Sequence, residues 1–232
     1  MSSTQNTVSV EPTARSYAER SAAFQAELAR QVPTEVMSRL NAEIEATVRS
    51  NAGAHALRAG TTAPDFTLPD SQGNPVALAN LLRSGPAIVA FYRGDWCPYC
   101  DLQLKAYQEI LPRIRAAGAS LVAISPQTAK YCQITADKRK LDFPLLSDPG
   151  NQVARRFGLV FQVSEGMLAV LGGFGIQLAD YNGESSAELP VPGAFVIARD
   201  GRIDLEYVNP DYRERLEPAA ILRRLEQLKI SH

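Results

Sequence analysis

Two of the three cysteines in this 232-residue chain stand close together, in the stretch Cys97-Pro-Tyr-Cys100. An apolar run typical of a buried central strand, residues 87–92, precedes the pair, and a helical pattern running toward Arg115 follows it. The pair therefore lies where a strand passes into the first turn of a helix, whose unpaired N–H groups stabilise a thiolate. Two intervening residues leave the second cysteine one helical turn on, within disulfide reach. The spacing predicts a dithiol/disulfide redox site.

The composition is that of a globular protein and argues against several other classes. The 24 basic and 25 acidic residues give a net charge of -1, which argues against a dedicated binder of nucleic acid or of membrane surfaces. Hydrophobic residues make up 45% of the chain, as in folded domains. Three cysteines and two histidines are sparse for a structural zinc site or a disulfide framework. We expect neither a metal nor an organic cofactor.

The first residues carry no basic segment followed by an apolar run, so no secretory signal is visible. No apolar stretch of about 18 residues is present, and no transmembrane helix is expected. We therefore expect a cytoplasmic protein, a compartment in which a CxxC pair cycles rather than acting as a fixed crosslink.

The N-terminal part, residues 1–57, is predicted to be a disordered tail to about residue 13 and then two helices, over 14–31 and 33–50. One face of the second helix carries four apolar residues at helical spacing: Met37, Leu40, Ile44 and Val48. Helices this short need a packing partner. The apolar face packs either on the rest of the chain or on a second copy, in a homodimer, and the pattern leaves both open.

The remaining residues, 58–232, alternate between strand and helix patterns. The expected elements are a short hairpin around 63–75, strands over 87–92 and 120–125, helices over 98–115, 127–139 and 151–157, a hairpin over 193–208 and a helix over 218–228. Such alternation indicates an α/β domain with a parallel core, to which the late hairpin adds an antiparallel part.

The stretch from Phe91 to Cys100 resembles the active-site segment of the thioredoxin superfamily, and its flanks resemble the peroxiredoxins of the alkyl hydroperoxide reductase/thiol-specific antioxidant (AhpC/TSA) family. Residues 63–68 are similar to that family's first hairpin, and residues 143–149 to the bacterioferritin-comigratory type of peroxiredoxin. The resemblance covers about residues 58–230. It implies a thioredoxin-like fold, a central mixed sheet flanked by helices, with an N-terminal helical extension.

On the peroxiredoxin pattern, Cys100 takes the peroxidatic position and Cys97 that of a threonine which hydrogen-bonds the peroxide. Arg93 takes the position of a proline. Peroxiredoxins also place an arginine before the Phe-Val-Ile strand to hold the thiolate, and this chain has Pro192 there. This position resembles that of the cis proline which faces the CxxC pair in thioredoxins, and so implies a cis peptide bond after Val191.

Four neighbours are expected to support the cysteine pair: Arg93, Trp96, Pro98 and Tyr99. Trp96 shields the sulfurs, Pro98 suits an early helical position, and the Pro-Tyr dipeptide affects the redox potential. Arg93 either supports a thiolate or is a solvated loop charge. Asp95 and Asp101 are expected to be exposed and to tune the local field.

Two activities run through a Cys97–Cys100 couple. In the first, favoured by the resemblance over most of the chain, one thiolate attacks a hydroperoxide, becomes a sulfenic acid and condenses with the other cysteine. In the second, Cys97 attacks a protein disulfide and Cys100 resolves the mixed disulfide. A thioredoxin or glutathione system then reduces the pair. Cys97, expected to be exposed, is the favoured nucleophile, although the peroxiredoxin pattern points to Cys100. A non-catalytic binding module is the third alternative.

Three further features bear on the site. Cys132 is expected to be a buried small hydrophobe rather than a third redox thiol. Residues 160–190 exceed a minimal thioredoxin connection, so we expect them to border the active-site groove. The segment 211–215 is expected to start the last helix with surface ion pairs, with a role near the site for Tyr212 or Arg213 as the alternative.

Overall fold

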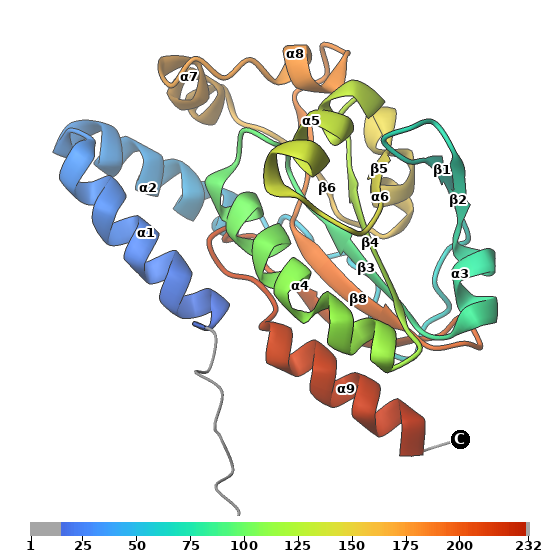
Figure 1. Cartoon of the computed structure of the whole chain (residues 1–232). Helices are drawn as coiled ribbons and strands as arrows, with labels where there is room; N and C mark the ends of the chain where they lie inside the picture. The colour runs from blue at the N-terminus through green and yellow to red at the C-terminus, as the bar shows by residue number, and fades with distance from the viewer. Residues whose placement is uncertain (1–14, 231–232) are drawn as a thin grey trace, which may run out of the picture.

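A mixed five-stranded sheet runs through the centre of the computed structural model, which describes residues 15–230 (Figure 1). In spatial order the strands are β5 (Leu145–Ser147), β4 (Ser120–Ser125), β3 (Ala87–Phe91), β8 (Gly193–Ile197) and β9 (Ile203–Val208). Strands β3, β4 and β5 are parallel, whereas β8 pairs antiparallel with both β3 and β9. The predicted parallel core with an antiparallel hairpin is confirmed.

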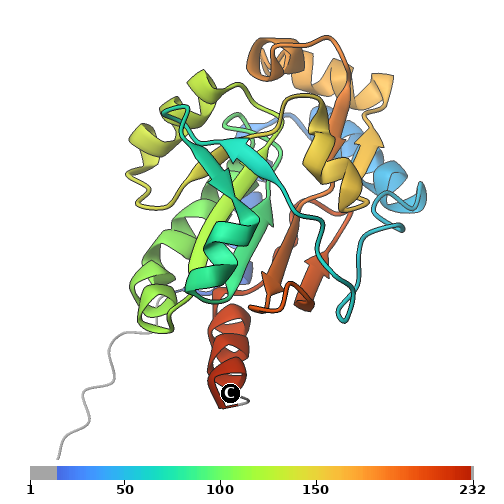
Figure 2. The same ribbon diagram turned by 90° about the vertical axis from the view of Figure 1, so that its right-hand side faces the viewer.

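Helices cover both faces of this sheet (Figures 1 and 2). They are α1 (Tyr17–Gln31), α2 (Thr34–Arg49), α3 (Leu78–Ser84), α4 (Pro98–Ala116), α5 (Ala129–Arg139), α6 (Gln152–Arg156), α7 (Glu165–Gly173), α8 (Leu178–Asn182) and α9 (Pro218–Ile230), with a 3-10 turn η1 (Pro149–Asn151) before α6. Two small antiparallel sheets complete the fold: β1 (Thr67–Pro69) with β2 (Pro75–Ala77), and β6 (Val160–Gln162) with β7 (Glu188–Pro190). The described helices include none that is long and apolar enough to cross a membrane.

The side chains of β3 alternate between two buried cores, because successive residues of a strand point to opposite faces. Ile88 and Ala90 face the core shared with α4 and α9. Val89 and Phe91 face the other core, where the Phe91 ring lies 5.0 Å from that of Phe157 and 6.0 Å from that of Phe195. All five residues of β3 are buried, which explains why its sequence is an uninterrupted apolar run.

The N-terminal helices pack along the rest of the chain. Helix α1 lies against α4, and α2 lies against α7 (Figure 1). Leu40 and Ile44 of α2 belong to the same core as α4 and α9, whereas Val48 is 41% exposed. Of the two alternatives for the apolar face of α2, packing within the chain is therefore confirmed. A homodimer contact stays a prediction, and the tail expected up to residue 13 lies outside the described residues.

The burial of α2 yields a stability prediction. Replacing Ile44, which is 2% exposed, with alanine leaves a cavity beneath the helix. We expect the free energy of unfolding to fall by about 2–4 kcal/mol, measured by urea denaturation. The matched control is Val48→Ala on the same helix, which should change stability by less than about 0.5 kcal/mol. Equal effects of the two substitutions would show that α2 is not anchored by this core.

Candidate active site

The cysteine pair lies where the loop after β3 turns into α4. Cys97 is the N-cap residue, Pro98 opens the helix, and the amide of Cys100 donates to the Cys97 carbonyl oxygen at 3.1 Å. The loop requires glycine at position 94, because its φ is +155° and a Cβ there would lie 2.4 Å from Nε1 of Trp96. The predicted junction of strand, cysteine pair and helix is confirmed.

Both thiols are free and both are buried, with Cys97 1% exposed and Cys100 0% exposed. The expectation that Cys97 is exposed is wrong. Residues from α1, α2 and the loop before α9 pack around the start of α4 and cover it. The sulfurs therefore react in a site from which bulk water is largely excluded.

The positively charged and N–H donor groups of the site surround the Cys100 sulfur. It accepts hydrogen bonds from the backbone N–H of Arg93 at 3.4 Å and from Nη2 of Arg215 at 3.7 Å. Burial opposes the thiolate, but the hydrogen bond from the Cys97 thiol and the charges of Arg215 and Arg93 outweigh it. Together they lower the pKa of Cys100 to about 5.

Cys97 shows the opposite behaviour. Burial raises its pKa well above the ordinary value, and the hydrogen bond to the neighbouring Cys100 raises it further. The charges of Arg93 and Arg215 act against this rise without reversing it. At neutral pH the pair therefore consists of a thiolate at Cys100 and a protonated thiol at Cys97.

Arg215 comes from the loop between β9 and α9, and the sequence interpretation of 211–215 as a run of surface ion pairs missed it. Its side chain is 4% exposed and donates to Oε1 of Gln103 at 3.1 Å and to the carbonyl oxygen of Tyr212. The one available signal was Leu216, an apolar residue at the end of a charged stretch, which indicates that the segment turns inward. The alternative placing Tyr212 near the site is confirmed, because Tyr212 lines the cavity beside Cys97.

Arg93 is 3% exposed, so the interpretation of a solvated loop charge is wrong. Its guanidinium carbon lies 3.8 Å from the centre of the Tyr212 ring and 4.7 Å from that of Trp96. Aromatic faces attract a cation in this geometry. Arg93 thus brings a second buried positive charge to the cysteine pair.

Asp95 and Asp101 were expected to be exposed and are instead largely covered, with side chains 12% and 25% exposed. Both pair with Arg139 of α5, whose Nη2 also donates to the Asp95 carbonyl oxygen at 3.1 Å. Arg139 therefore ties the loop before the cysteines to the first turn of α4.

The expected cis bond before Pro192 is absent, since no peptide bond between residues 15 and 230 is cis. The chain runs extended from β7 into β8: the amide of Val191 donates to the Leu159 carbonyl oxygen at 2.8 Å, and Gly193 is already in register with Phe91. A trans bond serves this extended path. Pro192 is buried and is not among the residues that line the cavity beside Cys97.

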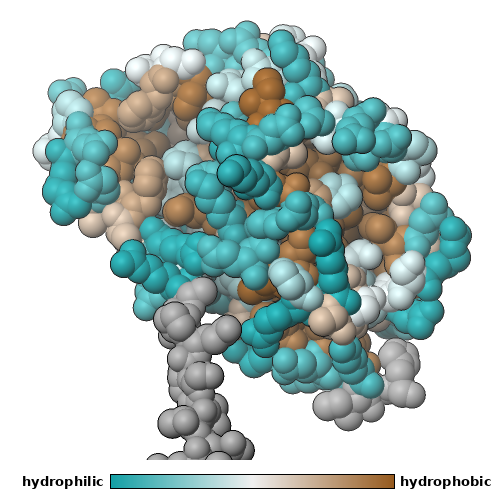
Figure 3. Space-filling view, viewed as in Figure 1, coloured by the Kyte–Doolittle hydropathy of each residue, from teal (hydrophilic) through white to brown (hydrophobic). Residues whose placement is uncertain are grey.

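A cavity of about 310 Å³ opens beside Cys97. Its other lining residues are Phe24, Leu28, Leu40, Arg93, Trp96, Pro98, Tyr99, Leu171, Phe174, Ile176 and Tyr212. Apolar side chains gather between the N-terminal helices and the middle of the face shown in Figure 3. The expectation that residues 160–190 border the groove is confirmed by three of these residues, and α1 and α2 supply a wall that was not predicted.

Aromatic rings connect the wall of the cavity to its floor. The ring of Phe24 on α1 meets that of Tyr99 edge-on at 5.3 Å, and Tyr99 meets Tyr212 at 5.6 Å. Tyr212 in turn covers the guanidinium of Arg93. These contacts hold the floor of the cavity against α1.

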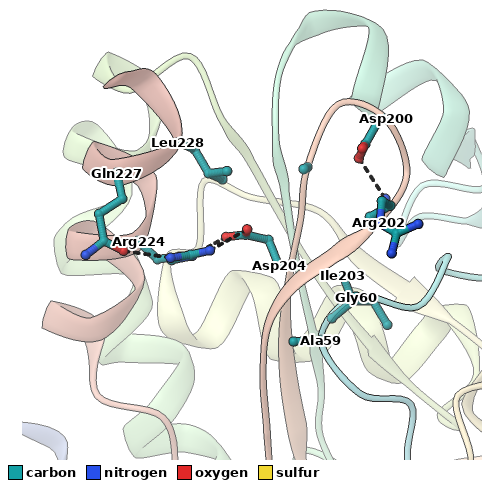
Figure 4. A pocket seen from close by; sticks show the side chains of 10 residues that line it. Ala59, Gly60, Asp200, Arg202, Ile203, Asp204, Arg224, Gln227 and Leu228 are labelled. Carbon is teal, nitrogen blue, oxygen red and sulfur yellow. Dashed lines mark hydrogen bonds and ion pairs between the residues drawn. The ribbon is translucent and has the colours of Figure 1, made fainter. Parts of the chain in front are cut away.

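A larger cavity of about 600 Å³ lies between β9 and α9 (Figure 4). Arg224 crosses it to Asp204, with Nη2 of the arginine 2.6 Å from Oδ1, and this carboxylate neutralises its charge. None of the cysteines lines this cavity, so it offers no thiol chemistry.

Cys132 behaves as predicted. It is fully buried, with its sulfur 3.9 Å from the hydroxyl oxygen of Ser125 and 4.0 Å from that of Tyr92. Burial raises the pKa of this thiol to about 11, which leaves it protonated and unreactive. Within the described part of the chain, no three His, Cys, Asp or Glu side chains are grouped so that they could hold a metal ion.

The electrostatics of the pair predict one low-pH titration. The ultraviolet absorbance of the thiolate should appear with a midpoint near pH 5 in the wild type, against about 8.5 for a free cysteine. Cys100→Ser should abolish this transition, and Cys97→Ala should raise its midpoint by removing a hydrogen-bond donor. If Cys100→Ser kept an absorbance transition at low pH, the thiolate would be assigned to Cys97 instead.

Comparison with known proteins places the chain in a family. The profile of the AhpC/TSA family matches residues 59–205. The chloroplastic peroxiredoxin Q of Sedum lineare is 35% identical over 138 residues, which cover 60% of this chain and 72% of that protein. The fold also matches the crystal structure of peroxidoxin BcpB from Mycobacterium tuberculosis, with a TM-score of 0.58 and 25% sequence identity. The match covers 74% of this chain and 97% of the BcpB chain. Peroxiredoxin Q of Xanthomonas campestris is similar in fold, with a TM-score of 0.54 and 19% sequence identity. The match covers 74% of this chain and 97% of the Xanthomonas chain. The chain belongs to the AhpC/TSA family.

Proposed function

We propose that this protein is a thiol-based peroxidase of the peroxiredoxin type that reduces hydroperoxides through Cys97 and Cys100. The observation that carries the proposal is the placement of the Cys100 sulfur, which is buried and accepts from Arg215 and from the backbone N–H of Arg93, with Cys97 one turn away. This placement lowers the pKa of Cys100 and so favours a thiolate there. Its relatives in the AhpC/TSA family, among them the Sedum lineare peroxiredoxin, support the same activity.

The reaction follows from the protonation states of the pair. The Cys100 thiolate attacks one peroxide oxygen, the O–O bond breaks, and the departing alkoxide takes a proton to leave as an alcohol, or as water from hydrogen peroxide. Cys100 is then a sulfenic acid. The Cys97 sulfur attacks it, water leaves, and a Cys97–Cys100 disulfide forms. The two positive charges nearby stabilise the negative charge on the departing oxygen.

Access and ionisation favour different sulfurs as the first nucleophile. Cys97 lines the cavity, whereas Cys100 lies behind it. The thiolate, not the thiol, is the nucleophile, and the positive groups of the site converge on Cys100. We therefore assign the first attack to Cys100 and the resolving step to Cys97, which reverses the preference for Cys97 drawn from the sequence.

The disulfide must be reduced for another turnover, and we propose a dithiol donor of the thioredoxin type or glutathione for this step. The cytoplasmic location expected from the sequence stays a prediction, since the Sedum lineare relative is named as chloroplastic.

The cavity suggests which hydroperoxides fit. Apart from Arg93 and the tyrosine hydroxyls, its lining is apolar, and two of its walls come from α1 and α7. We propose that it takes the apolar body of an organic hydroperoxide while the peroxide group lies at the cysteines.

Separate cysteine substitutions test the assignment of roles. Cys100→Ser should lower peroxide consumption by about 10³-fold or more, because the nucleophile is lost. Cys97→Ser should still consume one equivalent and accumulate a sulfenic acid on Cys100, detected by mass spectrometry after dimedone labelling. Cys132→Ala, the matched thiol control, should retain wild-type turnover. Full single turnover by Cys100→Ser together with a dead Cys97→Ser would reverse the two roles.

The substrate preference is tested at the rim of the cavity. Phe174 is 45% exposed, so replacing it with serine should not disturb folding. Losing this apolar contact should lower the ratio of kcat/KM for cumene hydroperoxide to that for hydrogen peroxide by about fivefold. Ile134→Ser, a similarly exposed apolar site on α5 away from the cavity, is the control and should leave the ratio unchanged. If both substitutions left the ratio of kcat/KM values unchanged, the cavity would have no part in substrate choice.

A further inference from the structure

The site contains an imbalance of buried charge. Arg93 and Arg215 are 3% and 4% exposed, and among residues 15–230 neither forms an ion pair with a carboxylate. The partners of Arg215 are the Gln103 side chain, two backbone carbonyl oxygens and the Cys100 sulfur. Arg93 lies against two aromatic rings, and its Nε has no hydrogen-bond partner. Buried arginines are ordinarily paired with an anion.

The carboxylates close to Arg215 along the chain do not fill this role. Glu214 is exposed, and Glu217 accepts hydrogen bonds from the backbone N–H groups of Tyr17 and Ala18. Asp211 is bound by Arg213, which donates to both of its oxygens and reaches Oδ2 from Nη2 at 2.7 Å. The Asp95 and Asp101 carboxylates are likewise taken by Arg139. The Cys100 thiolate is therefore the anion that faces the two buried guanidinium groups.

Oxidation removes that anion. A Cys97–Cys100 disulfide carries no charge, so both guanidinium groups then remain in a poorly hydrated site without a counter-charge. The reduced pair is stabilised and the disulfide is not, which is the condition that makes a disulfide strongly oxidising. We propose that Arg93 and Arg215 make the oxidised protein a disulfide donor to thiols, and a poor reductant of disulfides in other proteins. The inference rests on the proposed function in one respect only: the hydroperoxide supplies the oxidising equivalents that form the Cys97–Cys100 disulfide.

The donation step uses the two sulfurs in fixed roles. A thiolate of the acceptor dithiol attacks the Cys97 sulfur, which lines the cavity, and the Cys97–Cys100 bond breaks. Cys100 leaves as the thiolate that Arg215 and Arg93 stabilise, and a leaving thiol of low pKa departs faster. The second thiolate of the acceptor then attacks the first acceptor sulfur, which is bonded to Cys97 in the mixed disulfide. The acceptor becomes a disulfide, and Cys97 leaves and takes up a proton, so two electrons pass from the acceptor to the pair.

The equilibrium of the couple tests this. The protein, oxidised with diamide, is equilibrated without oxygen against thioredoxin of known potential, and the disulfide fraction is measured by alkylation and mass spectrometry. We expect the exchange to favour reduced Cys97 and Cys100 by at least about 100-fold, which corresponds to about 60 mV. The oxidised protein should also form the disulfide of a reduced, unfolded protein containing a single cysteine pair. An exchange constant near or below one would overturn the proposal.

Arginine substitutions assign the effect to the buried charges. Arg93→Met and Arg215→Gln should each shift the exchange toward the disulfide by about tenfold or more, or about 30 mV. Arg215→Lys keeps the charge and should restore most of the wild-type value. The matched control is Arg224→Met, which should leave the equilibrium unchanged. Arg224 is paired with Asp204 (Figure 4), in a cavity that none of the cysteines lines. Equal shifts in the control and the Arg93 variant would remove these arginines as the cause.

Thermal unfolding supplies a second readout that involves no exchange partner. A disulfide ordinarily stabilises a protein, but one more oxidising than that of the unfolded chain destabilises it. We expect the oxidised protein to unfold at a lower temperature than the reduced protein, and the difference to shrink in Arg93→Met. If Arg215→Gln does not fold, Arg93→Met carries the test. A higher melting temperature for the oxidised wild type would contradict the proposal.

None of the exchange and unfolding measurements uses a peroxide. A failed peroxidase assay therefore leaves these measurements valid, and their failure leaves the peroxidase proposal intact.

Discussion

The contact between the Arg215 guanidinium and the Cys100 sulfur is the interaction on which the site depends. It joins the loop before α9 to the first turn of α4, and both residues are buried. The surrounding structure holds that loop in place. Tyr17 of α1 donates its hydroxyl to the Arg213 carbonyl oxygen at 3.0 Å, and Tyr107 of α4 donates to that of Leu216 at 3.2 Å. Two helices from different parts of the chain thus fix the position of one cation.

The scaffold and the surroundings of the site come from different stretches of sequence. The matched family region, residues 59–205, contains the sheet up to the first half of β9, the cysteine pair and Arg93. Other groups that cover and charge the pair lie on either side of that region: Phe24, Leu28 and Leu40 before it, and Tyr212 and Arg215 after it. The family fold therefore provides the strand-to-helix junction, while the flanking segments define the cavity and much of its electrostatics. A protein with the same region and the same two cysteines, but with different flanks, would therefore hold the pair in a different environment.

Patterns local in sequence predicted most of the fold, because periodicity and the positions of turns depend on neighbouring residues. The run at 87–92, the helices of the N-terminal part and the late hairpin were found in this way. The same reasoning pointed to Cys97 and Cys100 as a candidate site and to residues 160–190 as a border of the groove. It did not find α3, β5, β6, β7 or α8, which are short and carry few periodic residues. It also placed Asp95 and Asp101 at the surface, because their partner Arg139 is distant in sequence. Arg215 was missed for the same reason, and the trans bond at Pro192 depends on pairings of β7 and β8 that a single motif does not reveal.

The position of Trp96 gives the molecule a built-in optical probe. It is the sole tryptophan of the chain, it lines the cavity together with Cys97, and its ring lies against the cation of Arg93. The emission of an indole changes with nearby charge, with contact to sulfur and with exclusion of water. Each chemical state of the pair, and any molecule that enters the cavity, should therefore leave its own fluorescence signature without a label. The ring that lines the cavity beside Cys97 therefore offers a way to follow changes at the pair by fluorescence.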